Sequence, residues 1–150
     1  MLRTPLLHPA ILSAAAAAGH GSLVLIADGN YPASTTVGPH AQVVHLNLTP
    51  GTVDAVTVLA VLAAALPVEA AYVMSPDPDG PHASWPDPEI WARFAETLAA
   101  AGCVTPIRGI PRHDFYAEAA TPAVALVVVT AETALYGNLL LRIGVVEPDQ

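Results

Sequence analysis

The chain has 150 residues, of which 53% are hydrophobic and 12% are charged, and its formal net charge is −8. This length fits a single domain over residues 1–150, and the negative charge disfavours nucleic acid and anionic membrane surfaces as partners. No apolar run approaches the ~20 residues that a membrane-spanning helix needs. The low charge is therefore better explained by a homo-oligomer, in which the copies cover each other's apolar surface, than by a chain that crosses a membrane. The single Cys103 excludes an internal disulfide and suits a reducing, cytoplasmic location.

Helices alternate with apolar strands along the chain. In chain order we predict a helix at 9–18, strands at 22–27 and 42–47, a helix at 53–66, a strand at 69–74, a helix at 88–102, a strand at 104–107, a helix at 111–120, and strands at 123–129 and 138–145. The first segment could pass for a secretory signal, but Pro9 is a favoured first residue of a helix, so we expect a helix there. The alternation predicts α/β architecture: one domain with a layered sheet and flanking helices.

Two segments are predicted to lie outside this regular framework. Residues 29–39 contain two glycines and two prolines, which indicates a loop after the strand at 22–27. The carboxyl end of a strand is where open α/β sheets bind ligands. Residues 75–89, with the sequence SPDPDGPHASWPDPE, contain five prolines, so we expect an acidic surface excursion without regular structure.

His20 and Asp28 flank the first predicted strand and are the titratable groups of an otherwise apolar passage. One interpretation places both in a functional site, at a separation fixed by the strand. The alternative is structural: His20 would bond a carbonyl at the end of the preceding helix, and Asp28 would cap the following turn through backbone amides. From these residues alone the two interpretations are about equally supported.

Further candidates lie toward the end of the chain. Tyr136, Gly137 and Asn138 place a phenol and an amide on a glycine-containing turn directly before the last predicted strand. Arg112 begins a predicted helix, where a positive charge opposes the helix dipole, and Tyr116 one turn later can face the same side. The structural alternatives are a surface ion pair of Arg112 with Asp114 and an interfacial aromatic role for Tyr116.

The candidate set comprises an imidazole, a carboxylate, a guanidinium, phenols and an amide, without a strong nucleophile. Such groups suit the binding of polyhydroxyl compounds and the transfer of a proton, and they do not suit acyl or phosphoryl transfer. The six histidines lie in separate segments without the spacing of metal ligands, so we expect neither a metal nor an organic cofactor. A small sugar is the predicted ligand.

Several segments resemble the fucose mutarotase and D-ribose pyranase family. The matching segments are MLRTPLLHPAIL at 1–12, GHG at 19–21, the strand that ends at Asp28, NYPAS at 30–34 and LYGNLLLRIGV at 135–145. PRHDFY at 111–116 and the glycine at 137 are more similar to the L-fucose mutarotase branch. The chain departs from the family in the proline-rich 75–89 segment and in Gly29-Asn30-Tyr31, which leaves the role of that segment and the preferred sugar open.

The resemblance implies an isomerase that interconverts the α and β anomers of a monosaccharide, L-fucose or a related sugar. It implies His20 as the proton donor, and Asp28, Arg112 and the turn Tyr136-Gly137-Asn138 as sugar-binding residues, with Tyr116 as a further candidate. Family members form ring-shaped oligomers, often decamers, with sites near subunit contacts. The alternatives are a non-catalytic monosaccharide-binding ring protein and a ribose pyranase.

Overall fold

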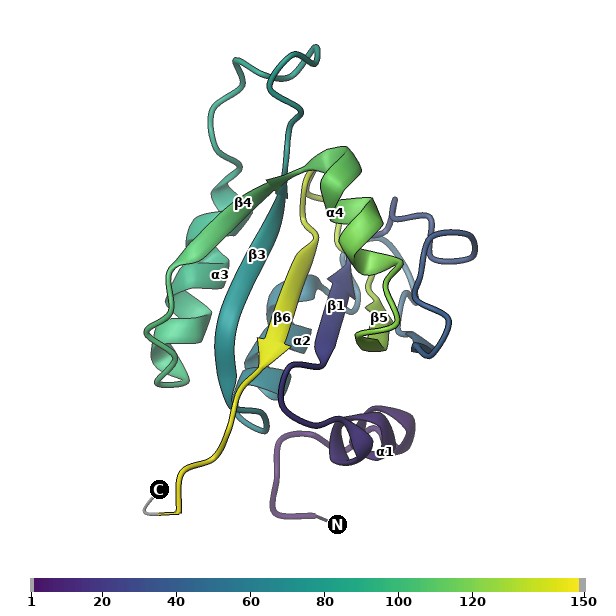
Figure 1. Cartoon of the computed structure of the whole chain (residues 1–150), viewed down its shortest axis with the longest axis vertical. Coiled ribbons are helices and arrows are strands. Elements are labelled where there is room, and N and C mark those ends of the chain that lie inside the picture. The colour runs from purple at the N-terminus through teal and green to yellow at the C-terminus, as the bar shows by residue number, and fades with distance from the viewer. Residues whose placement is uncertain (1, 149–150) are drawn as a thin grey trace.

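The computed structural model describes residues 2–148 and shows one six-stranded sheet flanked by helices (Figure 1). The predicted α/β class is thereby confirmed. The elements in chain order are α1 (Pro9–Ala17), β1 (Leu23–Ala27), β2 (Gln42–His45), α2 (Ala55–Ala63), β3 (Val68–Ser75), α3 (Glu89–Ala100), β4 (Ile107–Pro111), α4 (Arg112–Ala119), β5 (Val124–Val129) and β6 (Leu139–Ile143).

The strand order in the sheet is β2-β5-β1-β6-β3-β4. Strands β2, β5 and β1 are mutually parallel, as are β3 and β4, whereas β6 is antiparallel to both of its neighbours, β1 and β3. All strands except β6 therefore end at the same edge, which we call the carboxyl edge. It lies toward the top of Figure 1, and the two chain termini lie at the other end, the opposite edge.

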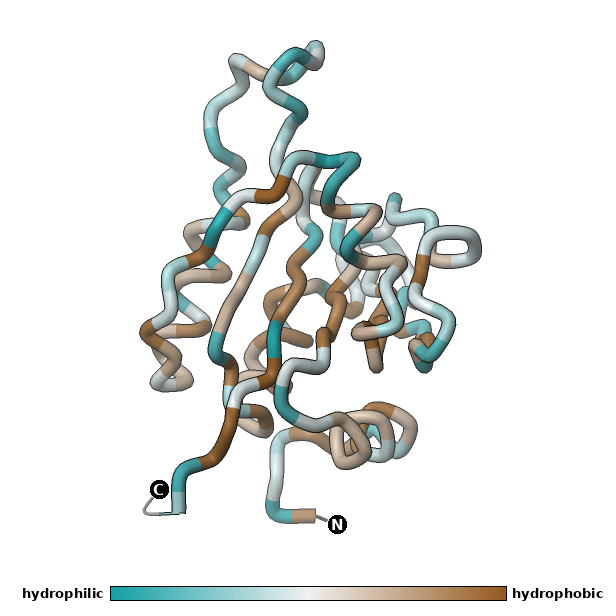
Figure 2. Tube along the Cα trace, in the orientation of Figure 1, coloured by the Kyte–Doolittle hydropathy of each residue, from teal (hydrophilic) through white to brown (hydrophobic). Residues whose placement is uncertain are grey.

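Apolar side chains cover both faces of the sheet, because successive residues of a strand point to opposite sides. Val24 and Ile26 of β1 belong to the core beneath α1, α2 and α3. Leu23 and Leu25 pack instead in a second core with Phe115 of α4. Strand β1 is buried along its whole length, as its sequence predicts, and it appears as a brown central segment in Figure 2.

Strand β4 differs from its predicted position. We predicted a strand at 104–107, but β4 spans Ile107–Pro111 because it pairs in parallel with the last five residues of β3. Pro106 lacks a backbone N–H and cannot donate to that ladder. The shift carries the end of β4 to the carboxyl edge, where α4 begins directly with Arg112.

Helix α2 is shorter than predicted. The Asp54 carboxylate accepts a hydrogen bond of 2.7 Å from the Thr57 amide and caps the helix at its start. The helix ends at Ala63, after which the Ala65 and Leu66 amides both donate to the Leu62 carbonyl. Within residues 2–148, no helix combines the length and apolar character required to cross a membrane.

Candidate functional site

Asp28 and Asn138 form a buried, doubly hydrogen-bonded pair at the carboxyl edge. The Asp28 amide donates to Asn138 Oδ1 and Asn138 Nδ2 donates to Asp28 Oδ2, both at 2.8 Å. Asp28 follows β1 and Asn138 precedes β6, and these strands are neighbours in the sheet. Two predicted residues 110 positions apart are thus brought into contact, with relative exposures of 4% and 3%.

The second oxygen of the Asp28 carboxylate stabilises the next turn. Asp28 Oδ1 accepts a hydrogen bond of 2.9 Å from the Asn30 amide. Asp28 therefore caps the following turn, as the structural alternative predicts. Burial raises the pKa of Asp28, while the hydrogen bonds from Asn30 and Asn138 act in the opposite direction. The result is a well-oriented acceptor of hydrogen bonds at the end of a rigid strand.

The turn before β6 holds Tyr136 in an uncommon conformation. Tyr136 has a φ of 57°, in the left-handed region that residues other than glycine seldom adopt. Its carbonyl accepts a hydrogen bond of 3.1 Å from Trp91 Nε1 on α3. At the neighbouring Gly137, an added Cβ would lie 2.9 Å from the Ala134 carbonyl oxygen and 2.9 Å from a side-chain carbon of Glu132. Glycine is therefore required at 137 by close packing.

Arg112 and Tyr116 face the same side of α4, as predicted. The guanidinium carbon of Arg112 lies 5.6 Å from the centre of the Tyr116 ring, and that ring lies 5.6 Å from the ring of buried Tyr31. The pKa of Arg112 is raised, chiefly by the Tyr116 hydroxyl and less by Tyr136 and Asp77. No ion pair of Arg112 with Asp114 occurs in the described part of the chain.

His20 lies at the opposite edge, away from the other candidates. Its Nε2 is 3.2 Å from Oε2 of Glu69 at the start of β3, and 60% of its side chain is exposed. Strand β1 separates His20 from Asp28 and is about 17 Å long at the usual rise per residue. A single chain therefore does not bring His20 to the Asp28–Asn138 pair, which corrects the expectation that one strand builds the site. Glu69, which the sequence interpretation missed, is the residue that contacts His20.

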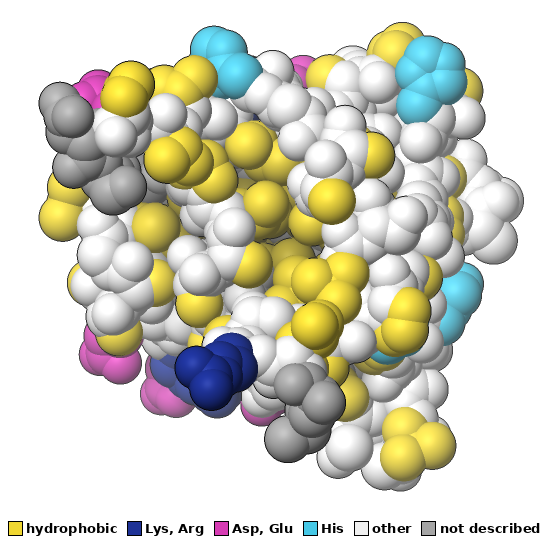
Figure 3. Space-filling view, turned by 90° about the horizontal axis from the view of Figure 1, so that it is seen from below, with side chains coloured by type: hydrophobic (Ala, Val, Ile, Leu, Met, Phe, Trp, Pro, Cys, Tyr) yellow, Lys and Arg dark blue, Asp and Glu magenta, His cyan; other side chains and the backbone are white. Residues whose placement is uncertain are grey.

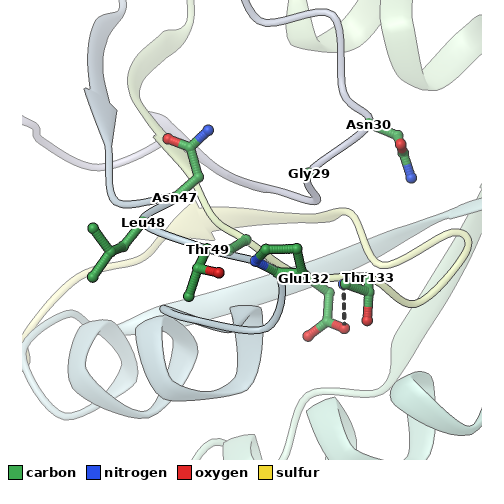
Figure 4. Close-up of a pocket in the computed structure, with 9 residues that line it drawn as sticks. Gly29, Asn30, Asn47, Leu48, Thr49, Glu132 and Thr133 are labelled. Carbon is green, nitrogen blue, oxygen red and sulfur yellow. Dashed lines mark hydrogen bonds between the residues drawn. The ribbon is translucent and has the colours of Figure 1, made fainter.

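A hollow of about 430 Å³ lies beside the Asp28 turn, between the ends of β1, β2 and β5 (Figure 4). It is lined by Gly29, Asn30, Asn47, Leu48, Thr49, Pro50, Ala131, Glu132 and Thr133. The Glu132 carboxylate accepts hydrogen bonds of 2.9 Å from the amides of Thr133 and Ala134, and one of 3.4 Å from the Ala55 amide at the start of α2. This buried acid, also missed from the sequence, therefore fixes the loop that leads to Tyr136.

Comparison with known proteins identifies the family of this fold. The model of the RbsD / FucU transport protein family matches residues 1–146. The chain belongs to this family. It is 40% identical over 149 residues to a human protein named fucose mutarotase, covering 93% of this chain and 90% of that protein.

Solved structures show the same fold. The fucose mutarotase of Streptococcus pneumoniae in complex with L-fucose superimposes with a TM-score of 0.79 at 22% identity, covering 98% of this chain and all of the other. Bacillus subtilis RbsD complexed with D-ribose gives a TM-score of 0.76 at 22% identity, with the same coverage.

Proposed function

We propose that the chain is a mutarotase that interconverts the α and β anomers of L-fucose or a related monosaccharide. The observation that carries the proposal is the buried Asp28–Asn138 pair at the carboxyl edge, in a chain that is 40% identical to a protein named fucose mutarotase. Asp28 would accept hydrogen bonds from sugar hydroxyls. Arg112, Tyr116 and Tyr136 would complete the sugar contacts, with Gly137 allowing the turn to pack closely.

The reaction opens the sugar ring by proton transfer, rotates the aldehyde group and closes the ring again. The ring oxygen gains a proton as the anomeric hydroxyl loses one, the open aldehyde turns its other face, and the ring recloses with the transfers reversed. Histidine is suited to this chemistry because it can give and accept a proton near neutral pH. We assign this role to His20, with Glu69 orienting the imidazole through the contact at Nε2. The reaction balances without a cofactor.

The position of His20 leads to the second part of the proposal: a second copy of the chain supplies it. Apolar side chains gather around a hollow on the opposite-edge face of the molecule (Figure 3). Glu69 lines a cavity of about 510 Å³ there, beside Val104 and Val145, whose exposures are 94% and 60%. Exposed apolar surface of this kind is typical of association sites. We infer that this edge of one copy packs against the carboxyl edge of another, in a cytoplasmic homo-oligomer such as a decameric ring.

The test of activity is the exchange between anomers, followed by saturation-transfer NMR on L-fucose, D-ribose, L-rhamnose and D-galactose. We expect His20→Ala to abolish the accelerated exchange without changing the far-UV circular dichroism spectrum, because His20 is exposed and outside the core. Full activity of this variant would refute the assignment. Sugar binding that perturbs the anomeric signals of the parent chain without speeding their exchange would favour a non-catalytic binding protein.

Complementation tests whether the site is shared between copies. His20→Ala and Asp28→Asn are each expected to be inactive alone. In oligomers co-assembled from equal amounts of both variants, about a quarter of the shared sites would combine an intact His20 with an intact Asp28. Recovery of about that fraction of the parent activity supports the shared site. No recovery in verified mixed oligomers refutes it, whereas the single variants still report on the mutarotase activity itself.

A further inference from the structure

The part of the proline-rich segment that lies between β3 and α3, residues 76–88, contacts the site through His82. The segment rises beyond the carboxyl edge between β3 and α3 (Figure 1). His82 Nδ1 lies 2.9 Å from the Tyr136 hydroxyl oxygen. The imidazole also stacks on Trp85 of the same segment, with ring centres 3.9 Å apart and an interplanar angle of 24°. The sequence predicts a surface excursion here, and this contact gives it a role that composition alone does not indicate.

A second contact fastens the beginning of the segment to α4. The Asp77 carboxylate lies 3.4 Å from His113 Nε2 and accepts a hydrogen bond of 3.4 Å from the His113 amide. His113 follows Arg112, so both contacts of the segment are made beside proposed sugar-binding residues. Two contacts therefore hold the segment at the carboxyl edge, one with the Tyr136 turn and one with α4.

The contact with His82 determines the direction of the Tyr136 hydroxyl. The backbone of Tyr136 is fixed by its left-handed conformation and by the hydrogen bond from Trp91. Among residues 2–148, His82 is the hydrogen-bond partner of the phenol oxygen. An imidazole nitrogen either accepts the phenol proton or donates its own to the phenol oxygen. In each case one hydrogen-bonding capacity of the phenol is used by His82, and the remaining capacity is available to a sugar hydroxyl.

We propose that His82 is a positioning residue that orients the Tyr136 hydroxyl toward the bound monosaccharide, so that the proline-rich segment contributes to sugar binding through this one side chain. This inference rests on the proposed function, because it takes Tyr136 as a sugar contact. His82 acts only through the phenol and does not touch the reacting atoms.

Two substitutions at His82 separate its hydrogen bond from its shape. His82→Asn retains a hydrogen-bonding atom near the position of Nδ1, whereas His82→Leu fills similar space without one. We expect His82→Leu to lower kcat/KM for anomer exchange about fivefold, as for loss of one neutral hydrogen bond, and His82→Asn to restore most of it. The control is Ser84→Leu, which adds a leucine to the same exposed segment and leaves the His82 contact intact.

A double-mutant cycle tests whether His82 acts through the phenol. In a Tyr136→Phe background, His82→Leu should cause no further loss, because the hydroxyl that it orients has been removed. Equal losses in both backgrounds would overturn the proposal and indicate a purely structural role. Unchanged kcat/KM in His82→Leu, with an active parent chain, would overturn it as well.

A spectroscopic measurement decides the contact independently of turnover. In protein labelled with ¹³Cζ-tyrosine, the Tyr136 resonance should shift in His82→Leu, shift less in His82→Asn and stay in place in Ser84→Leu. A Tyr136 resonance that His82→Leu leaves unmoved would overturn the positioning role. A parent chain without exchange activity would instead refute the proposed function, and the resonance would still show whether His82 governs the phenol.

Discussion

Replacing Asn138 by aspartate should make the stability of the protein strongly dependent on pH. Asn138 Nδ2 donates to Asp28 Oδ2 at 2.8 Å in a buried environment. Asn138→Asp replaces this donor by a carboxylate oxygen of nearly the same shape. Two buried carboxyl groups at this distance cannot both be ionised, so the pair retains one proton, and the pKa of that proton rises beyond the effect that burial already has on Asp28.

The sign follows from proton binding in the two states. A carboxyl group whose pKa is higher in the folded chain contributes stability that is fully present below its unfolded pKa and is lost as the pH rises through its folded pKa. At about pH 4 the retained proton forms a hydrogen bond between the two groups, and the variant should approach the parent in stability. At about pH 7.5 the folded variant must either hold a proton that the unfolded chain has released or leave Asp28 Oδ2 without a donor. We expect the loss to be about 3 kcal/mol, the upper end of the range for a hydrogen bond to a charged group.

Urea unfolding, followed by circular dichroism at one fixed protein concentration, measures this difference at both pH values. Asn138→Ala is the matched control. It removes the donor without adding a charge, so its stability relative to the parent should change much less with pH. An equal loss for Asn138→Asp at both pH values would show that Asp28 and Asn138 are not coupled as the structure indicates.

Two further predictions concern the turn before β6. Gly137→Ala should destabilise the protein by about 1–3 kcal/mol in urea unfolding, because the new Cβ would lie 2.9 Å from the Ala134 carbonyl oxygen. The control is Gly19→Ala, whose Cβ would meet nothing within 4 Å, so its effect on the free energy of unfolding should be nearly zero. Equal effects of the two would contradict the packing argument. Trp91→Phe should cost about 1 kcal/mol and shift the carbonyl ¹³C resonance of Tyr136, because it removes the hydrogen bond that Trp91 Nε1 donates to the Tyr136 carbonyl. An unshifted resonance would contradict this role of Trp91.

Local pattern predicted the positions of Asp28 and of the Tyr136 turn, because each directly flanks an apolar strand. It could not predict their contact, which depends on β6 entering the sheet between β1 and β3. Strand order is set by packing of the whole chain and leaves little trace in any one segment. The boundaries of β4 were wrong for the same reason, since its start is fixed by pairing with β3.

The two histidines show different limits of sequence interpretation. The strand that follows His20 was predicted correctly. Because this strand lies between His20 and Asp28, the two residues are far apart within one chain, which leads to the proposal of a second copy. The prolines around His82 predict irregular structure, but they do not indicate which part of the fold the His82 side chain contacts. Its contact with Tyr136 joins residues 54 positions apart and has no local signal.

The central position of β6 also has a consequence for biosynthesis. Residues 139–143 pair with both β1 and β3, so they join β2-β5-β1 to β3-β4. Until this strand has left the ribosome, the growing chain holds two partial sheets whose apolar inner edges lack a partner, which is a condition that favours aggregation. The sheet can therefore close only after residues 139–143 have been synthesised, and a chain that stops before residue 139 would leave β1 and β3 without this shared partner.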